Sequence, residues 1–374
     1  MSAEAGAGRA ADPLADLFAT PFHNPSIYAV RERAGNAREL LDFCVPANGY
    51  FPPPALLQAI QAELPDILKY YPDYAPVHQQ NLSRLVGTPA AHIVPANGVT
   101  ELITLLCAQA RGPIATDVPT FGRWTDLPLQ NGVPLHTLER RKEREFRLSA
   151  DEIVSATLAG RARTLVLCNP NNPTGACLSL AEIRHIVEAL PQLDRIVVDE
   201  SFIDFSGEES AESLAVDSHN AVVVKSLGKA LGWHGIRLGY GVANARTAEA
   251  LRDRLPYWNI NGLAACVLRH AWQHRDCYLA SFERVARDRD HMLARLRSIA
   301  SLRPYPSKAN FLLTELPPGL SGRQVRDALL QEHGLFVREC SNKMGSSESF
   351  LRLVVRKPAD AERLVIGLRA RLPP

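Results

Sequence analysis

The chain has 374 residues, which is more than one small domain needs and enough for two lobes with a large core. Hydrophobic residues make up 46% of it and charged residues 22%, as in an ordinary globular protein. The net charge of +2 excludes a general attraction to nucleic acid or to an anionic membrane surface, so any specificity has to come from a local site.

The amino-terminal segment and the cysteines indicate where in the cell the protein resides. Residues 1–18 contain neither a basic stretch nor a continuous apolar core, so no secretory signal is expected. No run reaches the roughly 18 apolar residues that span a bilayer. The seven cysteines are scattered and never spaced C-x-x-C, which argues against a disulfide framework or a zinc site. We therefore predict a cytoplasmic protein with no metal site and no membrane or nucleic-acid partner.

The middle of the chain alternates short apolar runs with helical patterns. Three continuous apolar runs are typical of strands buried on both faces: 164–168 (TLVLC), 195–199 (RIVVD) and 221–225 (AVVVK). Residues 180–190, between the first two, carry apolar side chains at helical spacing. This alternation predicts an α/β fold with a mostly parallel sheet flanked by helices. Active sites in such sheets lie beyond the carboxyl ends of the strands.

Beyond residue 256 the pattern changes to that of a smaller α+β domain. A long charged helix is predicted over about 261–299, followed by a strand at 309–314, a helix near 322–332, a strand at 350–356 and a terminal helix. The predicted organisation is an arm (1–50) that packs on the small domain, a large domain (51–256) and a small domain (257–374). We expect the ligand site in the cleft between the two domains.

Two basic residues follow the run at 221–225. Lys229, in S-L-G-K, comes just after the end of a buried strand, where a partly desolvated amine is a better nucleophile. Arg237 stands among glycines in G-I-R-L-G-Y, and its guanidinium group suits a phosphate or a carboxylate. A single lysine is more often a surface charge, but the two together indicate an anionic ligand that carries a carbonyl group.

Three more segments each have an ordinary structural explanation when taken alone. Asp199 ends a strand, where a carboxylate pairs with a protonated ring nitrogen or caps the next segment. Asn172 lies in the rigid turn N-P-N-N-P-T-G, and its amide is a donor for a ring oxygen. Gly98 and Val99 open a helical pattern, and free N–H groups at a helix start favour a phosphate.

Taken together, the order of these segments and the S-x-x-K-x7-R spacing resemble one family. The chain is similar to fold-type I enzymes of the class I/II aminotransferase group, which depend on pyridoxal 5′-phosphate (PLP). Within that group it resembles the branch of histidinol-phosphate aminotransferase and threonine-phosphate decarboxylase. The resemblance extends over about residues 41–368 and implies a large PLP-binding domain plus a smaller α+β domain.

The resemblance also implies roles for individual residues. Lys229 would form the Schiff base with the cofactor and move the α-proton, and Asp199 would pair with the pyridinium nitrogen. Asn172 would donate to the ring 3-oxygen. Phe121 would stack on the ring, with Trp124 as a second candidate.

The other residues implied by the resemblance bind anionic groups. The cofactor phosphate would be held by Gly98, Val99, Ser226 and Arg237. Arg352, in F-L-R-L-V, would clamp the substrate carboxylate, and Asn48 would lie in the loop near the substrate. Tyr71 would reach the cofactor phosphate of a neighbouring subunit, which implies a homodimer with shared active sites.

Several positions depart from the family pattern. Phe202 stands where a tyrosine is usual, Gly228 replaces a serine or threonine, and His234 replaces a proline. The loop around Asn48 is unlike either branch. Four residues could line a pocket for an anionic side chain: Tyr50, Arg123, Arg338 and Lys343. The alternative is that the basic ones are only solvated surface charges, as exposed basic residues usually are.

Two reactions fit this set of residues. The leading hypothesis is transamination of an amino acid or amino-acid-like substrate, because it is the commoner outcome in the wider group. The alternative is decarboxylation of a phosphorylated or otherwise anionic amino acid, which Phe202 and the LRLVVR segment at 351–356 favour. A non-catalytic PLP sensor would need a DNA-binding module, and nothing before Leu41 is long or basic enough for one. A scaffold without activity is disfavoured because the cofactor positions are filled.

Overall fold

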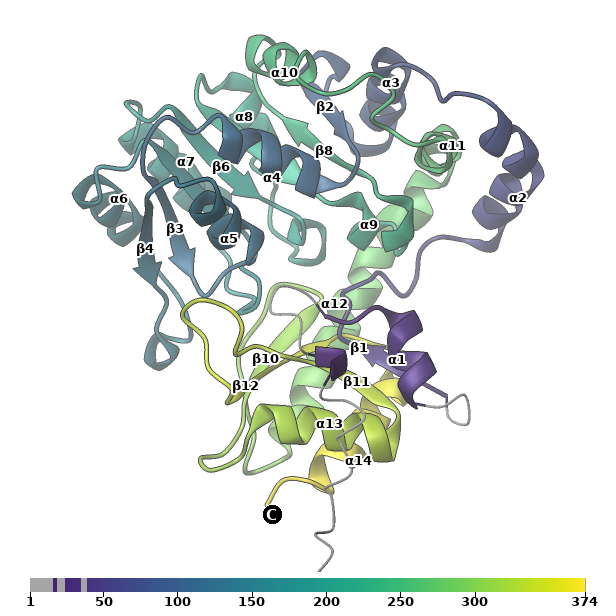
Figure 1. The fold of residues 1–374 in the computed structure, drawn as a ribbon, viewed down its shortest axis with the longest axis vertical. Helices are drawn as coiled ribbons and strands as arrows, with labels where there is room; N and C mark the ends of the chain where they lie inside the picture. Colours follow the sequence, from purple (N-terminus) through teal and green to yellow (C-terminus); the bar gives the residue numbers. More distant parts are fainter. Residues whose placement is uncertain (1–15, 19–23, 35–38, 374) are drawn as a thin grey trace, which may run out of the picture.

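The protein, described by a computed structural model over residues 16–18, 24–34 and 39–373, forms two sheets, each with its own hydrophobic core (Figure 1). Residues 1–15, 19–23 and 35–38 of the predicted arm lie outside the described residues. In the described part of the chain, no helix is both long and apolar enough to cross a membrane.

The larger sheet has seven strands in the order β2-β8-β7-β6-β5-β3-β4. Their bounds are β2 (Ile93–Ala96), β3 (Ile114–Val118), β4 (Leu135–Glu139), β5 (Thr164–Cys168), β6 (Arg195–Asp199), β7 (Ala221–Lys225) and β8 (Gly239–Val242). All neighbours from β7 to β4 pair parallel, and β8 is antiparallel to both β7 and β2. The three apolar runs seen in the sequence are β5, β6 and β7, residue for residue.

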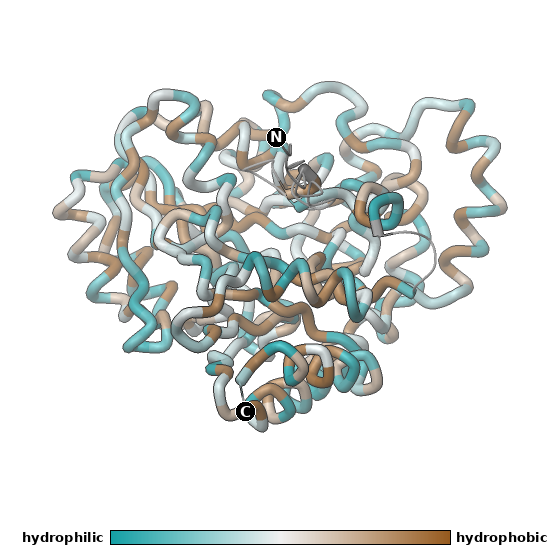
Figure 2. The backbone as a smooth tube through the Cα atoms, turned by 60° about the horizontal axis from the view of Figure 1, so that its bottom comes forward, coloured by the Kyte–Doolittle hydropathy of each residue, from teal (hydrophilic) through white to brown (hydrophobic). Residues whose placement is uncertain are grey.

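Helices cover both faces of this sheet, because alternate side chains of a strand point to opposite faces. Val166 and Val197 pack in one cluster with residues of α4 (Val99–Ala108), α5 (Arg123–Gln130) and α10 (Ala245–Arg252). Leu165 and Val198 pack in another cluster with residues of the helices on the opposite face: α2 (Pro54–Lys69), α3 (Ala75–Val86), α6 (Ala150–Ala159), α7 (Leu180–Ala189), α8 (Glu212–Asp217) and α11 (Gly262–Ala271). In Figure 2, brown and teal alternate along the outer helices, as expected for helices with one buried face.

The smaller sheet has five strands in the order β1-β11-β12-β10-β9. They are β1 (Leu41–Phe43), β9 (Arg303–Pro304), β10 (Phe311–Glu315), β11 (Leu335–Glu339) and β12 (Phe350–Val354). β1 pairs parallel with β11, and the other pairs are antiparallel. The sheet carries α13 (Gly322–His333) and α14 (Pro358–Arg369), and α1 (Ile27–Ala34) lies beside β1 (Figure 1).

The long helix predicted over about 261–299 is divided into α11 and α12 (Arg275–Arg297), separated by a 3-10 turn at 272–274. The buried residues of α11 belong to the core of the large sheet, as do Tyr278 and Phe282 at the start of α12. Met292 and Leu296, further along α12, pack in the small core. The two cores therefore meet within α12, and not at the boundary expected between residues 256 and 257. Figure 1 shows α12 running from one sheet to the other.

Candidate active site

A cavity of about 310 Å³ lies where the carboxyl edge of the large sheet faces the small sheet. Seven of the residues predicted from the sequence line it: Val99, Phe121, Asn172, Ser226, Lys229, Arg237 and Arg352. Parallel strands place their carboxyl ends at one edge, which is why segments far apart in sequence meet there. Eight lining residues were not singled out from the sequence: Asn24, Cys44, Val45, Pro46, Thr100, Gly122, Asp126 and Asn342. Thr100 and Asp126 lie in helices and the others in loops, and no local pattern marks any of them.

Lys229 lies in α9 (Leu227–Ala230), the single turn that follows β7. Its Nζ is 5.2 Å from the ring centroid of Phe202, which is buried and packs edge-on against Phe311. Burial lowers the pKa of the Lys229 amine to about 8, although the charge of Asp199 opposes this shift. A larger fraction of the amine is therefore neutral at physiological pH, as attack on a carbonyl requires.

Asp199 ends β6 and is almost fully buried. Its Oδ1 accepts hydrogen bonds from the backbone N–H (3.1 Å) and the hydroxyl (2.6 Å) of Ser201. Its Oδ2 accepts one from the indole Nε1 of Trp124, at 2.9 Å. Trp124 is therefore engaged with the carboxylate. Phe121, three residues earlier, lines the cavity, which agrees with the preference for Phe121 as the stacking ring.

Arg352 and Asn172 form one unit, which the sequence did not indicate. The Nη1 of Arg352 donates to the Oδ1 of Asn172 at 2.8 Å, and its Nη2 donates to the carbonyl of Cys44 at 2.6 Å. The Nε of Arg352 is buried with no hydrogen-bond partner among the described residues. The guanidinium group is thus fixed in place, and the Asn172 amide nitrogen remains free to donate elsewhere.

The start of α4 and Arg237 meet at a crowded point. Gly98 has a φ of +74°, and a Cβ there would lie 2.6 Å from the Arg237 Nη2. A Cβ at Gly239 would lie 2.7 Å from the backbone nitrogen of Val99. Arg237 itself has a φ of 53°, a left-handed conformation that is rare for a residue with a side chain. Glycine at 98 and 239 therefore lets the start of α4 and the Arg237 guanidinium approach closely, which suits a phosphate group.

Two of the departures from the family pattern are in direct contact. A Cβ at Gly228 would lie 3.2 Å from the Cα of His234 and 3.4 Å from the carbonyl oxygen of Trp233, so a larger residue at 228 has little room. The His234 Nε2 donates to the carbonyl of Pro46 at 2.8 Å. Burial, helped by the nearby Lys229, lowers the pKa of His234 to about 4, so the imidazole is neutral at physiological pH.

Three further cations line the cavity: Arg123, at the start of α5, and Arg338 and Lys343 from the small domain. Arg338 donates to Asn24, and its Nη2 donates to Asn342 at 2.6 Å. Lys343 donates to the carbonyl of Thr120 at 3.2 Å. Burial and repulsion by Arg338 and Arg352 lower the pKa of Lys343 to about 7. Within the described chain none of the three forms an ion pair with a carboxylate, and Asp126 is the one acidic side chain in the cavity wall, so the cavity has an excess of positive charge.

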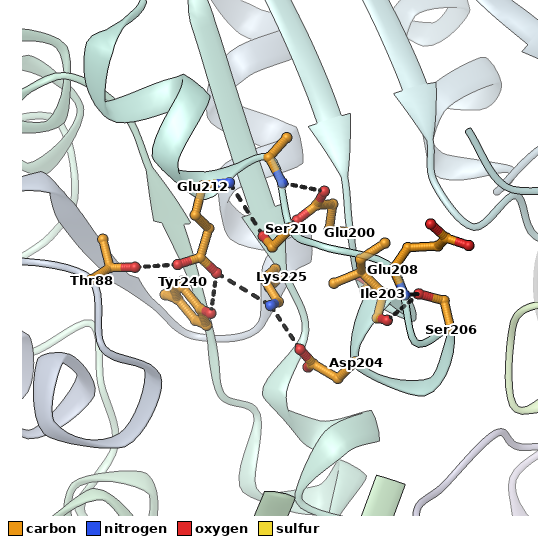
Figure 3. Close-up of polar contacts among 12 residues, drawn as sticks. Thr88, Glu200, Ile203, Asp204, Ser206, Glu208, Ser210, Glu212, Lys225 and Tyr240 are labelled. Atoms are coloured by element: carbon orange, nitrogen blue, oxygen red, sulfur yellow. Dashed lines mark hydrogen bonds and ion pairs between the residues drawn. The ribbon is translucent and has the colours of Figure 1, made fainter. Parts of the chain in front are cut away.

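A buried charge network lies behind the cavity, at the carboxyl ends of β6 and β7 (Figure 3). The Lys225 Nζ contacts Asp204 Oδ1 at 2.9 Å and Glu212 Oε1 at 3.2 Å. Glu212 also accepts hydrogen bonds from Thr88 and, at 2.7 Å, from Tyr240. Burial alone would lower the pKa of Lys225, but Asp204, Tyr240 and Glu212 outweigh it and hold that pKa well above its usual value. The network ties β7, β8 and the segment after β6 together.

Four of the predicted site residues are absent from the cavity wall: Gly98 and Asp199, described above, and Asn48 and Tyr71. The Asn48 Nδ2 donates to the Ala230 carbonyl at 2.9 Å and to the Ser281 hydroxyl at 2.7 Å. The Asn48 amide therefore fixes its own loop to α9 and α12, and a substrate contact of Asn48 stays a prediction. Tyr71 is 80% exposed and stacks on Trp258, with the ring centroids 4.7 Å apart. Tyr50, another candidate, donates to Asp288 at 2.6 Å and is likewise absent from the cavity wall.

Comparison with known proteins now decides the family. The model of the family described as aminotransferase class I and II matches residues 38–368. The chain belongs to this family. Its enzymes depend on PLP, so the cofactor and fold-class predictions are confirmed. The glycines, basic groups and acceptors described above fit that cofactor.

Relatives in both predicted branches match most of the chain. The L-serine phosphate decarboxylase of Sulfurospirillum multivorans is 29% identical and covers 93% of this chain and 92% of its own. The histidinol-phosphate aminotransferase of Methanopyrus kandleri is 28% identical over 80% of this chain and 74% of its own. The structure of the Sinorhizobium meliloti histidinol-phosphate aminotransferase with PLP has a TM-score of 0.81 at 22% identity, covering 94% of this chain and 96% of its own.

Proposed function

We propose that this enzyme decarboxylates an O-phosphorylated amino acid of the serine or threonine phosphate class. The observation that carries the proposal is the excess of cations in the cavity. Arg237 is used for the cofactor phosphate and Arg352 for the substrate carboxylate, which leaves Arg123, Arg338 and Lys343 for a second anionic group. The relative from Sulfurospirillum multivorans supports the same substrate class.

We propose the following division of roles. When bound, PLP supplies an electron-withdrawing pyridine ring that stabilises charge at the α-carbon. Asp199, fixed by Trp124 and Ser201, holds the proton on the ring nitrogen, and Asn172 donates to the ring oxygen. Arg352 orients the carboxylate that leaves as CO₂. Lys229 carries the cofactor and returns a proton to the α-carbon.

Decarboxylation balances as loss of CO₂ from the α-carbon and its replacement by a proton, giving a phosphorylated amine. The test is to incubate purified holoenzyme with O-phospho-L-serine and O-phospho-L-threonine and to measure CO₂, amine and 2-oxo acid. We expect CO₂ and amine in equal amounts. Accumulation of a 2-oxo acid without CO₂ would favour transamination, the second candidate, which the histidinol-phosphate aminotransferase relative supports.

Replacing Arg338 with glutamine should reduce kcat/KM for the phosphorylated substrate by about 100-fold, because a charge-assisted hydrogen bond contributes about 1.5–3 kcal/mol. The same amino acid without its phosphate should lose less than about threefold. Arg303→Gln is the matched control, because Arg303 is exposed on β9 and absent from the cavity wall. An equal loss for both substrates would contradict a phosphate-binding role.

The pH dependence of kcat/KM should report the charge on Lys343, since this ratio reflects the ionisation of the free enzyme. The pKa of Lys343 is lowered to about 7, so the amine loses its charge as the pH rises through 7. We therefore expect kcat/KM for the phosphorylated substrate to decline above pH 7. The decline should be absent in Lys343→Met and displaced to higher pH in Lys343→Arg, because a guanidinium stays charged. A decline that persists in Lys343→Met would assign it to another group.

We further propose that the enzyme acts as a homodimer. Tyr71, Tyr74 and Trp258 form a stacked aromatic cluster, and Tyr257 beside it is 87% exposed. Exposed aromatic clusters of this kind mark interfaces. Light scattering should give twice the mass of the 41.1 kDa chain. If Tyr71 reaches the site of the second subunit, Tyr71→Ala should weaken cofactor retention in a protein that still forms dimers.

A further inference from the structure

A cluster of potential metal ligands lies between α2 and α11, which pack side by side in the large unit (Figure 1). Cys266 and His270 belong to α11, and Glu63 belongs to α2. Each of the three offers one ligand atom, and these atoms all lie within 4.8 Å of one another. All three residues are outside the wall of the active-site cavity, so the reaction proposed above does not use them.

The two helices approach each other closely at a glycine. A Cβ at Gly262, the first residue of α11, would lie 3.1 Å from the carbonyl oxygen of Ile67 near the end of α2. Residues four apart on a helix share a face, so Cys266 and His270 continue the line that begins at Gly262. Glu63 lies one turn before Ile67 on the facing helix, which brings its carboxylate to the same line. The cysteine spacings predicted no metal site, but Glu63 is 203 residues from Cys266, a contact that no local spacing records.

The three side chains form a ligand set that suits zinc. His270 Nε2 lies 2.5 Å from Glu63 Oε1, and Cys266 Sγ lies 3.6 Å from Glu63 Oε2. Thiolate, imidazole and carboxylate groups bind Zn²⁺, whereas Mg²⁺ and Ca²⁺ prefer oxygen ligands alone. Three protein ligands leave the fourth tetrahedral position to water. Cys266 is buried while Glu63 and His270 are partly exposed, which gives the ion a path to the thiol.

A neighbouring arginine competes for the same carboxylate. Arg269 Nη2 donates to Glu63 Oε2 at 2.5 Å, and its Nη1 contacts Asp73 Oδ2 at 3.3 Å. Hydrogen bonds from Arg269 and His270 lower the Glu63 pKa to about 2, so this group is a carboxylate at physiological pH. An ion that takes Glu63 leaves Arg269 beside Asp73, so the guanidinium group keeps an acidic partner.

We propose that Glu63, Cys266 and His270 bind a zinc ion that links α2 to α11 and displaces Arg269 from Glu63. The thiol releases its proton to solvent when it binds the ion, because the thiolate is the ligand. The link stabilises the packing of the two helices, since a metal that binds only the folded protein adds its binding free energy to the stability of the fold. This role is independent of the reaction proposed above.

Zinc binding is tested by titration calorimetry of the holoenzyme, after dialysis against a chelator and then against metal-free buffer. We expect one zinc ion per chain, with a Kd of about 1 µM or below. Cys266→Ser and the less buried Glu63→Gln should each weaken binding at least about tenfold, because even a group that only orients a ligand contributes about 10–100-fold to metal affinity. Cys277→Ser is the matched control, since Cys277 is an exposed cysteine on α12, and it should bind zinc as the parent does.

Three further measurements separate this site from adventitious binding and from a network of hydrogen bonds alone. Arg269→Gln should tighten zinc binding by about threefold or more, since it removes a cation that competes for Glu63. X-ray absorption of the zinc-loaded holoenzyme should show one sulfur ligand at about 2.3 Å. Zinc should raise the melting temperature of the parent but not that of Cys266→Ser.

Absence of zinc binding, or binding that is equally tight in the parent, Cys266→Ser and Glu63→Gln, would overturn the site. A zinc spectrum without sulfur would do the same. Binding that is no tighter in Arg269→Gln would overturn the displacement of this arginine. Substrate is absent from all of these measurements, so their failure and the failure of the proposed decarboxylation are read separately.

Discussion

Replacing Lys229 with alanine is expected to reduce turnover by at least about 1,000-fold, since a positioned acid–base group alone contributes about 10²–10⁴. The variant should also bind PLP without a covalent link, so that borohydride no longer fixes the cofactor to the chain. Turnover is measured with the phosphorylated amino acids, and covalent attachment by mass spectrometry after reduction.

The fold of the Lys229→Ala variant should survive, which separates a catalytic defect from unfolding. The pKa of Lys229 is lowered to about 8 from an ordinary value of 10.5, so the unfolded chain binds more protons than the folded one between these pH values. The parent apoprotein should therefore gain stability as the pH rises from 8 to 10.5, and the variant should lack that part of the gain. A variant that melts far below the parent at pH 7 would show that the lysine is also structurally required.

Replacing Lys225 with methionine is expected to lower the free energy of unfolding by about 3–5 kcal/mol, the usual cost of removing one partner from a buried ion pair. Lys225 is 6% exposed and is the cation between Asp204 and Glu212 (Figure 3). Without it, both carboxylates lose a compensating charge in a low-dielectric environment. The measurement is denaturant unfolding of the holoenzyme, followed by circular dichroism.

Two variants control this result. Lys308→Met removes a lysine that pairs with Glu208 at 3.1 Å on the surface, and it should cost no more than about 1 kcal/mol. Adding Glu212→Gln to Lys225→Met should recover part of the loss, because one uncompensated charge is removed with its partner. A Lys225→Met protein as stable as Lys308→Met would show that water or relaxation compensates the buried acids.

Local sequence predicted three of the seven strands of the large sheet, and it proposed the cofactor-binding positions. β5, β6 and β7 were predicted residue for residue because parallel strands buried on both faces need unbroken apolar runs. Lys229 and Asp199 were found because each follows or ends such a strand, and the carboxyl ends of parallel strands converge. Lys225, although it closes the AVVVK run, attracted no prediction, since a lysine at a strand end is ordinarily a solvated charge.

The boundary between the two cores was decided by packing. α11 and α12 have the same helical periodicity, so the sequence predicted one long helix. It also predicted that the domain boundary lies before this helix. In the structure α11 packs with α2 and α3, and the change of core falls within α12. Periodicity reports that a helix has a buried face, but it does not report which core buries that face.

The sequence by itself determined the family and the cofactor, and it predicted which residues would hold that cofactor. The tertiary structure alone decided which of these side chains are free to act. In the folded protein the Asn48 amide is hydrogen-bonded to the Ala230 carbonyl, Arg352 donates to Asn172, and Trp124 donates to Asp199. The tertiary structure also brought Arg123, Arg338 and Lys343 to the wall of one cavity without ion-pair partners among the described residues. Such partnerships join positions far apart in the chain, and hydrogen bonds and charges act through distance in space, which no local pattern records.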